Sequence, residues 1–538
     1  MKRRSICQLQ HIPRHPMKEL NSLEDLIKKL PNQKWQIVSI ILYSSTILSV
    51  GGSFSFNDLG LGDLKYKCIF PNFTNYSVKI SINQCEAKLY ENVSLSTNTS
   101  YISTKSCKSF IYSPGEIFET SAISRFNAIC ENKFLIKFDL FIYLLGGLLA
   151  LFSLSHLADL FGRKKSVSAM LLFGAMAELG MTISPTFVVF AFCRFFNGYF
   201  VSGIYQVSFT TALEFAPNTS RDSIAVLIFL FFSLSLFINA FSSWLFRKWI
   251  PFLIVSIILY CIPLLGILMF GKESPRWLYV KKPYEFSKFV QKQFKSNPEL
   301  FSTDIQFFLK ENCTTTKFKE KQLDNTDTLL SVLRNKKIMF NMFFLVSFAI
   351  STYLVYYGIL FGASVFELNP HIYYAFLGIA EILGSVLIFV MSRFLSRRPI
   401  HFISFFFSGL LCAIAGIIPK SNIWCISFIY FSVVMGKLFS TVSFANHFVW
   451  ASELYPTSHR SLLTGVTISS GRIAVLSIPY IKFLTEEIWQ PLLPLCFGGS
   501  AVIISFLCIF VQDSKKLELM DKIVQTPVEL DDVGDTNI

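Results

Sequence analysis

The sequence is divided into apolar blocks of about 20 residues, and this division restricts the chain to very few folds. At a rise of about 1.5 Å per residue, one such helix crosses a hydrocarbon core about 30 Å thick. Helices satisfy their own backbone hydrogen bonds in lipid, whereas open strands do not. We therefore predict an all-α membrane protein with twelve spans, at residues 35–56, 134–157, 166–183, 186–213, 223–246, 249–270, 338–362, 370–393, 400–418, 423–450, 462–484 and 489–511.

Composition agrees with a membrane protein and argues against a nucleic-acid-binding one. Hydrophobic residues make up 52% of the chain and charged residues 16%, which is too apolar for a soluble globule of this length. The net charge of +14 could suggest a polyanionic partner. The basic residues, however, lie in loops predicted to be cytosolic, such as 163–165, and the positive-inside rule accounts for them. We expect membrane lipid, and no nucleic acid, as a partner.

The spans form two groups of six, separated by a long polar insert. The first 34 residues are polar and basic, and the first apolar block is too long for a cleavable signal peptide, so we expect both termini in the cytosol. The predicted divisions are a cytosolic segment 1–34, a six-helix bundle 35–270, a cytosolic loop 271–337, a second six-helix bundle 338–511 and a cytosolic tail 512–538. Amphipathic stretches in the loop predict a short helical layer there.

A second insert, 57–133, separates spans 1 and 2 and is predicted to be extracellular. It holds four N-glycosylation sequons, at Asn72, Asn75, Asn92 and Asn98. It also holds four cysteines, which predict two disulfides with three possible pairings. These cysteines are Cys68, Cys85, Cys107 and Cys130.

Three charged residues lie near the middle of their spans: Glu381, Lys437 and Arg472. A charge in hydrocarbon costs several kcal/mol, so such residues face a partner or a water-filled cavity. Their formal sum is +1, and they are candidates for binding a small organic ion near the bilayer midplane. The alternative is that Glu381 pairs with Lys437 or Arg472 as a structural bridge. We also expect an ion pair between Glu178 and Arg194 near the outer ends of their spans.

Aromatic residues are candidates for the walls of the same cavity. Amphiphilic ions need apolar walls beside one anchored charge. Tyrosines in the middle of a span are better candidates than any of the 58 phenylalanines, most of which face lipid or core. The candidates are Tyr353, Tyr356 and Tyr357 in one span, Tyr205 and Phe209 on one helix face, and Phe444 one helical repeat beyond Lys437.

Charged motifs follow the predicted inner ends of several spans. Residues 155–165 read Ser-His-Leu-Ala-Asp-Leu-Phe-Gly-Arg-Lys-Lys, and a weaker version recurs at 392–399. A Glu followed seven residues later by an Arg occurs after both span 4 and span 10. We predict that these charges form a cytosolic gate that holds the two halves together when the inner side closes. Its members are Asp159, Gly162, Arg163, Lys164, Glu214, Arg221, Arg397, Arg398, Glu453 and Arg460.

These motifs carry a resemblance to a known family. The loop 155–165 resembles the signature of the major facilitator superfamily, with Ser155 in place of the usual Gly. Glu273-Ser-Pro-Arg-Trp-Leu and Glu453-Leu-Tyr-Pro-Thr, together with the large outer insert that ends at Cys130, resemble the organic cation/anion transporter branch. The resemblance covers roughly residues 35–511. It implies two six-helix bundles, a plasma-membrane location and transport by alternating access, with no cofactor or metal.

The resemblance also bears on the charge of the substrate. Arg472 lies nineteen residues after Glu453, where organic anion carriers have an Arg and cation carriers typically have an Asp. A guanidinium can hold a carboxylate or sulfate with two parallel hydrogen bonds, so an anion or zwitterion is favoured. The acidic residue Glu381 resembles a feature of the cation and zwitterion carriers. Ser385 stands where anion carriers often have a Lys.

Other functions stay open as alternatives. The chain could be an organic cation or carnitine-like transporter, or a transport-inactive sensor or partner protein, because Ser155, Ser392 and Ser396 weaken the loop signatures. A membrane enzyme is not supported, since the seven His residues form no catalytic grouping and no P-loop is present. The oligomeric state is not predicted.

Overall fold

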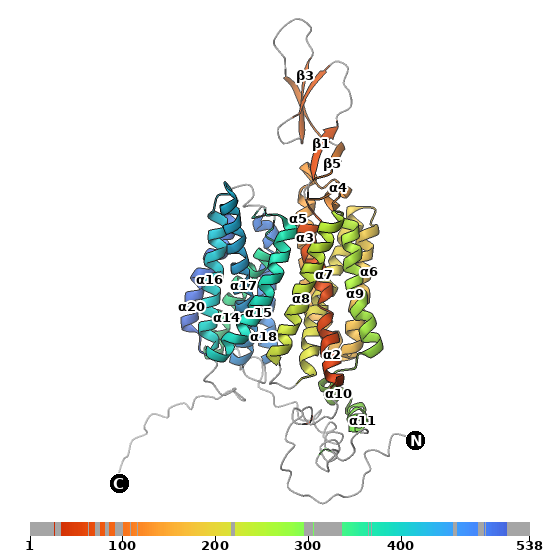
Figure 1. Cartoon of the computed structure of the whole chain (residues 1–538), viewed down its shortest axis with the longest axis vertical. Helices are drawn as coiled ribbons and strands as arrows, with labels where there is room; N and C mark the ends of the chain where they lie inside the picture. Colours follow the sequence, from red (N-terminus) through yellow and green to blue (C-terminus); the bar gives the residue numbers. More distant parts are fainter. Residues whose placement is uncertain are drawn as a thin grey trace, which may run out of the picture.

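The protein is a bundle of long membrane-type helices that carries a small β-rich insert at one end (Figure 1). The computed structural model describes residues 26, 34–62, 64–69, 76–80, 85–91, 101–107, 109–115, 117–216, 221–294, 305, 336–363, 365–366, 368–455, 460–482, 489 and 491–513. We call the end that carries the insert the outer end and the opposite end the inner end, following the topology expected from the sequence.

The helices form two groups, as the sequence predicts. The amino-terminal half contains α2 (Lys34–Ser45), α3 (Leu48–Leu59), α5 (Phe134–Phe161), α6 (Arg163–Ile183), α7 (Phe187–Glu214), α8 (Arg221–Phe246) and α9 (Trp249–Phe270). The carboxyl-terminal half contains α14 (Lys336–Leu360), α15 (Pro370–Phe394), α16 (Arg397–Ile417), α17 (Ile423–Leu454), α18 (Arg460–Val475) and α20 (Leu492–Leu507), followed by η5 (Cys508–Phe510). Within the described ranges, eleven helices are long and apolar enough to cross a membrane.

The eleventh predicted span, 462–484, is interrupted, and a proline explains the interruption. Helix α18 ends at Val475, and helical backbone resumes only at residues 478–482. Pro479 has no backbone N–H, and its ring clashes with the carbonyl four residues earlier, which belongs to Val475. The two intervening N–H groups instead make the tighter bonds of a 3₁₀ turn, from Leu476 to Ile473 and from Ser477 to Ala474.

The first span is broken in a related way between α2 and α3. The side chains of Ser45 and Thr46 donate hydrogen bonds to the carbonyls of Leu42 and Tyr43, at 2.8 and 2.7 Å. Such bonds compete with the helical backbone ladder and bend helices. This break lets α3 follow a separate course beside the outer half of α8 and α9.

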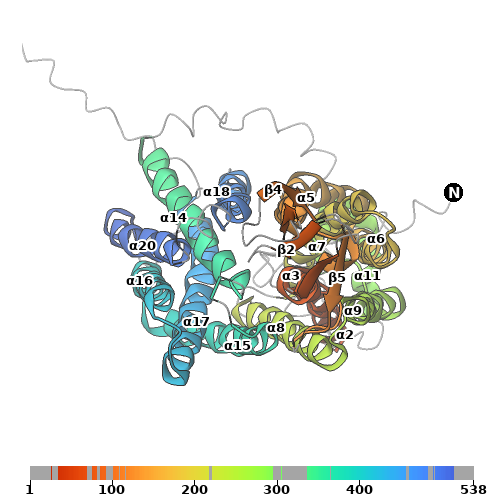
Figure 2. The same cartoon turned by 90° about the horizontal axis from the view of Figure 1, so that it is seen from above.

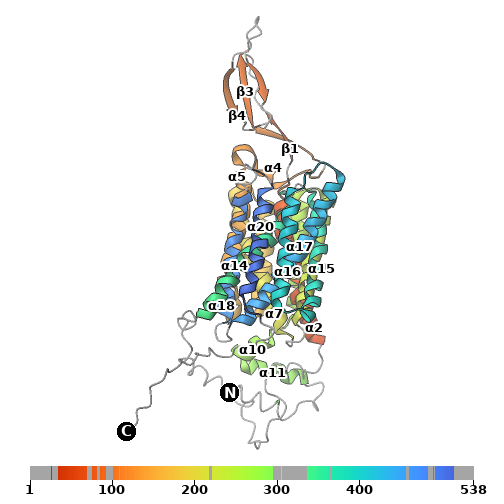
Figure 3. The same ribbon diagram turned by 90° about the vertical axis from the view of Figure 1, so that its left-hand side faces the viewer.

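The insert consists of short antiparallel strands above the outer end (Figures 1 and 3). β1 (Lys65–Ile69) pairs with β5 (Ser109–Ser113), and β3 (Glu86–Glu91) lies between β2 (Tyr76–Ile80) and β4 (Tyr101–Ser106). The structure selects one of the three possible pairings and joins Cys68 to Cys107 and Cys85 to Cys130. The four sequons lie outside the described residues.

The chain leaves the insert through α4 (Ala122–Phe126) and η1 (Cys130–Asn132), which lead into α5. Here the insert is tied to the amino-terminal half, because Arg247 donates to the carbonyl of Gly115 at 2.5 Å and Thr120 bridges to Lys248. One aromatic contact reaches the other half, since the ring of Phe118 packs on His371 at 5.2 Å between centroids.

Two short helices form the layer predicted at the inner end (Figure 3). α10 (Pro275–Lys281) starts at a serine cap, because the Ser274 hydroxyl accepts from the Trp277 N–H at 3.2 Å. α11 (Pro283–Phe294) is amphipathic and buries Phe286, Val290 and Phe294. The described part of the 271–337 loop is therefore helical where the sequence is amphipathic.

The two halves meet mainly where α8 lies beside α15 (Figure 2). The Ser233 hydroxyl of α8 donates to the carbonyl of Gly378 in α15 at 2.6 Å. Inside the amino-terminal half, α5 and α7 cross so closely that a Cβ at Gly146 or Gly198 would lie 2.2 or 2.0 Å from a backbone oxygen of the opposing helix. Only glycine permits this crossing, which fixes the side chains of α5 and α7 that face each other.

Candidate functional site

A pocket lies between the two halves and is lined by both. Its walls are mostly aromatic, with one cation. The lining residues are Phe54 from α3, Val201, Ser202 and Tyr205 from α7, Phe229 and Phe232 from α8, Tyr356, Tyr357 and Leu360 from α14, Phe444 from α17 and Arg472 from α18. The cavity predicted at the interface of the two bundles is therefore present, and five of the predicted site residues line it: Arg472, Tyr356, Tyr357, Tyr205 and Phe444.

Arg472 is the cation of this pocket. Its side chain is half-buried, and its Nη1 donates to the carbonyl of Gly147 in α5 across the interface at 3.3 Å. Its Nε is buried without a hydrogen-bond partner. Among the described residues, no carboxylate forms an ion pair with it. Arg472 lies in the last turn of α18, where the carbonyl end of the helix favours a positive charge.

Glu381 and Lys437 pair with each other behind the pocket wall. The Lys437 Nζ lies 2.8 Å from Glu381 Oε1, and both side chains are fully buried. The Tyr356 hydroxyl also donates to Oε1, at 2.6 Å, and the Thr441 hydroxyl donates to Oε2, at 2.7 Å. Glu381 therefore pairs with Lys437 as a structural bridge, which was the alternative considered from the sequence. Neither charge of the pair lines the pocket.

Two aromatic candidates also lie behind the wall rather than in it. Tyr353 is fully buried and packs on Phe444 at 4.9 Å between ring centroids. Phe209 shares a face with Tyr205, as predicted, with centroids 6.3 Å apart, but it does not line the pocket. Their proposed contact with a substrate would need a rearrangement of these helices.

The outer side of the pocket is closed by contacts between the halves. Phe54 packs on Tyr357 and Phe361, with ring centroids 5.8 and 6.1 Å apart. Farther out, the Tyr374 hydroxyl donates to Asp58 at 2.9 Å. We call these five residues the outer gate. Their closure means that this conformation does not open the pocket toward the insert.

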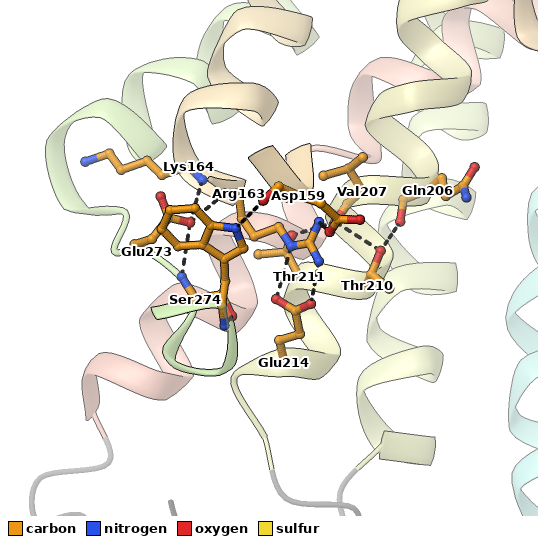
Figure 4. A network of polar contacts seen from close by, with 11 residues as sticks. Asp159, Arg163, Lys164, Gln206, Val207, Thr210, Thr211, Glu214, Glu273 and Ser274 are labelled. Atoms are coloured by element: carbon orange, nitrogen blue, oxygen red, sulfur yellow. Dashed lines mark hydrogen bonds and ion pairs between the residues drawn. The ribbon is translucent and has the colours of Figure 1, made fainter. Parts of the chain in front are cut away.

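The inner end of the amino-terminal half carries the predicted charge network (Figure 4). Arg163 binds Glu214 through Nη2 at 2.9 Å and Nε at 3.3 Å, and its Nη1 lies 2.7 Å from Asp159. This two-pronged arrangement suits the planar guanidinium. The network ties α5, α6 and α7 together at the inner end of one half.

The Glu-Ser-Pro-Arg-Trp motif completes this network (Figure 4). Glu273 accepts hydrogen bonds from the first two backbone N–H groups of α6, at 2.6 and 3.1 Å, and so places a carboxylate at the positive end of that helix. Trp277 donates from Nε1 to the carbonyl of Asp159 at 2.8 Å. Burial raises the pKa of Glu273, and the N–H groups that it accepts from oppose that shift.

Gly162 is the residue of this turn that a side chain would disturb most. Its φ is 102°, a conformation that L-residues rarely adopt, and an added Cβ would lie 2.7 Å from Glu273 Oε2. We predict that Gly162→Ala destabilises the folded protein by about 1–3 kcal/mol, from backbone strain.

The apparent melting temperature of purified protein measures this effect. Gly499→Ala in α20 is the matched control, because nothing lies within 4 Å of its added Cβ. A glycine in a helix interior costs about 0.5–1 kcal/mol relative to alanine, so this control should be neutral or slightly stabilising. Equal melting temperatures for Gly162→Ala and wild type would show that an alanine at this position is not strained.

The carboxyl-terminal half has a smaller inner network of its own. Arg397 binds Glu453 at 3.0 Å through Nη2 and at 3.3 Å through Nε, and Arg398 follows it at the start of α16. Lys164 in the other half donates to the carbonyl of Leu268 at 3.3 Å. In this conformation the ion pairs of Arg163 and Arg397 and the hydrogen bond of Lys164 each join residues of the same half. The side chains of Arg221 and Arg460 lie outside the described residues.

The predicted ion pair between Glu178 and Arg194 is wrong, because Arg194 pairs with a different acidic residue. Arg194 instead lies 3.3 Å from Asp139 of α5, and Glu178 accepts only from uncharged donors. Asp139 is in the second turn of α5, and its position near the end of an apolar block gave no signal of burial. The close crossing of α5 and α7 brings it to Arg194.

The comparisons with known proteins agree with this architecture. A profile of the family described as "Sugar (and other) transporter" matches residues 82–523. The chain belongs to this transporter family. An organic cation transporter-like protein of Drosophila melanogaster is 23% identical over 78% of this chain and 75% of its own length. Solute carrier family 22 member 3 of Mus musculus is 24% identical over 75% of this chain and 71% of its own length.

Solved structures show the same fold for this transporter. The inward open conformation of the xylose transporter XylE from E. coli superposes with a TM-score of 0.61 and 13% identity, over 90% of this chain and 97% of that one. The major facilitator fold and the resemblance to the organic cation/anion transporters, both expected from the motifs, are confirmed. The protein is a multi-pass membrane transporter.

Proposed function

We propose that this transporter moves small amphiphilic organic anions across the plasma membrane by alternating access. One observation carries the choice of an anion: Arg472 is the charge that lines the central pocket, and it has no carboxylate partner among the described residues. A desolvated guanidinium attracts an anion strongly, because the surrounding protein screens its charge poorly.

The neighbouring charges support the same sign. Glu381 and Lys437 lie 2.8 Å apart and neutralise each other. Of the three midspan charges, only the positive charge of Arg472 is therefore left to attract a ligand. A substrate carboxylate or sulfate would give the free Nε of Arg472 its missing acceptor. Tyr205, Tyr356 and Phe444 would pack against the apolar body of the substrate.

A cation substrate is the second candidate, because relatives at 23–24% identity are named organic cation transporters or solute carriers. It would need Glu381 as its anchor. In this conformation Lys437 and the Tyr356 hydroxyl both occupy that carboxylate. A cation would have to displace Lys437, which makes this the weaker reading.

The conformation fits one state of an alternating-access cycle. The outer gate is closed, and the Arg163 and Arg397 networks each stay within one half. We propose that these two networks approach each other in the opposite state, where the inner side closes and the outer gate separates.

Paired uptake assays test the charge preference. Fluorescein, an aromatic anion, and rhodamine 123, an aromatic cation on a similar ring system, are offered to cells that express the transporter and to matched cells that lack it. We expect transporter-dependent uptake of fluorescein and little of rhodamine 123. Uptake of rhodamine 123 alone would overturn the anion assignment, and binding of both dyes without uptake would favour a transport-inactive protein.

A further inference from the structure

A second group of ionisable side chains lies behind the outer gate, inside the amino-terminal half. Asp139 of α5, Glu178 of α6 and Arg194 of α7 are each fully buried, with at most 1% of the residue surface exposed. Asn197 and Tyr260 complete the cluster and are also fully buried. The proposed binding of an organic anion uses none of these groups.

Arg194 is directed toward Asp139. Its Nε lies 3.3 Å from Asp139 Oδ2, and its Nη1 donates to the carbonyl of Ser53 and to Asn197 Oδ1, both at 3.3 Å. The guanidinium also lies over the ring of Tyr143, 4.2 Å from its centroid. Its Nη2 and the Asp139 Oδ1 are buried without hydrogen-bond partners.

Glu178 has a different environment, without a cation. Its Oε1 accepts from Ser53 at 2.9 Å, Ser256 at 3.1 Å and Asn197 at 3.3 Å, all neutral donors. Its Oε2 is buried and has no partner. In the described part of the chain, no ion pair to Glu178 is found.

The charges of this cluster do not balance when both acids are ionised. Asp139 and Glu178 would contribute −2 and Arg194 +1, which leaves −1 in a site without solvent contact. An uncompensated buried charge costs several kcal/mol even after relaxation. The titratable groups that interact with Glu178 are Arg194, which is already paired with Asp139, and the phenols Tyr143 and Tyr260. A proton on the unpartnered Oε2 removes the imbalance.

The cluster is connected to the outer gate through α3. Ser53 contacts both Glu178 and Arg194, and the next residue, Phe54, is the gate residue that packs on Tyr357. Phe54 also packs on Tyr143, which lies under Arg194, at 5.9 Å between ring centroids. A movement of Phe54 away from the other half would therefore be transmitted to Ser53 and Tyr143, which contact the cluster.

We propose that Glu178 is a proton-binding site whose occupancy stabilises the closed outer gate. Closure dehydrates the carboxylate, which takes up one proton and becomes a carboxylic acid; opening rehydrates it and returns the proton to water. By linkage, acidification then populates the outward-closed state. The effect on transport rests on the proposed function, whereas the proton site itself does not.

Infrared spectroscopy of the purified full-length protein tests the site without any substrate. We expect a carbonyl stretch of a protonated carboxylic acid that shifts in D₂O, disappears in Glu178→Gln and persists in Glu131→Gln, which removes an exposed carboxylate. A spectrum without a Glu178-dependent acid band at any pH where the protein is folded would overturn the proposal. This result is independent of whether fluorescein is transported.

A distance measurement tests the link to the gate. Spin labels at Ile183→Cys and Ile423→Cys, exposed at the outer ends of α6 and α17, report the separation of the two halves. Acidification should shift the wild-type population toward the short distance, and Glu178→Gln should keep the short distance at every pH. The parent without these two cysteines is labelled in parallel to subtract the native thiols. A pH response that survives in Glu178→Gln would remove Glu178 as the proton site.

Discussion

Arg472→Asp is expected to abolish the uptake of fluorescein. The change removes the guanidinium that we propose binds the anionic group and puts a negative charge in its place in the pocket. A charge-assisted hydrogen bond contributes about 1.5–3 kcal/mol, so its loss alone lowers uptake about 10- to 150-fold. The repulsion from the new carboxylate adds to this loss. Initial uptake rates, normalised to the transporter at the cell surface, measure it.

Two further variants separate charge from geometry. Arg472→Lys keeps the charge but loses the planar pair of donors, so we expect an intermediate rate. Arg125→Asp makes the same kind of charge reversal at an exposed position in the α4 segment and should transport normally. Fluorescein uptake within about twofold of wild type in Arg472→Asp, well below the loss expected for one such bond, would exclude Arg472 from the site.

Lys437→Met is expected to have the largest effect on stability. Without Lys437, the Glu381 carboxylate keeps its two hydroxyl donors but loses its cation in a fully buried site. Removing one partner of a buried ion pair costs about 3–5 kcal/mol. The fraction of protein that remains monodisperse after heating, measured by fluorescence-detected gel filtration, reports this loss.

The matched double variant distinguishes the pair from simple packing. Glu381→Gln together with Lys437→Met removes both charges and keeps similar side-chain volumes, and replacing a whole buried pair in this way is often neutral. We expect the double variant to recover most of the stability lost in Lys437→Met. A double variant as unstable as the single one would show that Lys437 acts through its packing and not through its charge.

The spans were predictable from the sequence because lipid allows little besides long apolar helices. The first predicted residue of six spans differs from the first residue of the observed helix by at most one, and the two coincide at 134, 249, 370 and 423. The break after Val475 was missed, although Pro479 was visible, because the apolar block itself continues past it. The disulfide pairing was not predictable, since spacing alone leaves three choices open.

The candidate site was predictable in Arg472, its three tyrosines and Phe444, and not in its other members. Arg472 and Tyr356 stand out because polar groups are rare in the middle of a span. Phe54 and Phe232 line the same pocket and carried no signal among 58 phenylalanines. Which face of α8 meets the pocket is decided by the packing of α8 on α15, and that is a property of two distant segments. Asp139 was missed for the same reason.

The contacts that anchor the insert determine how an antibody against the outer surface would affect transport. Its strands are clamped to one half by Cys85–Cys130 and by the contact of Arg247 with Gly115, and Phe118 alone among these anchors leans on His371 of the other half. An antibody that binds the strands would move with that half and leave the transport rate unchanged. An antibody that binds between Phe118 and His371 would hold the two halves in one arrangement and slow transport.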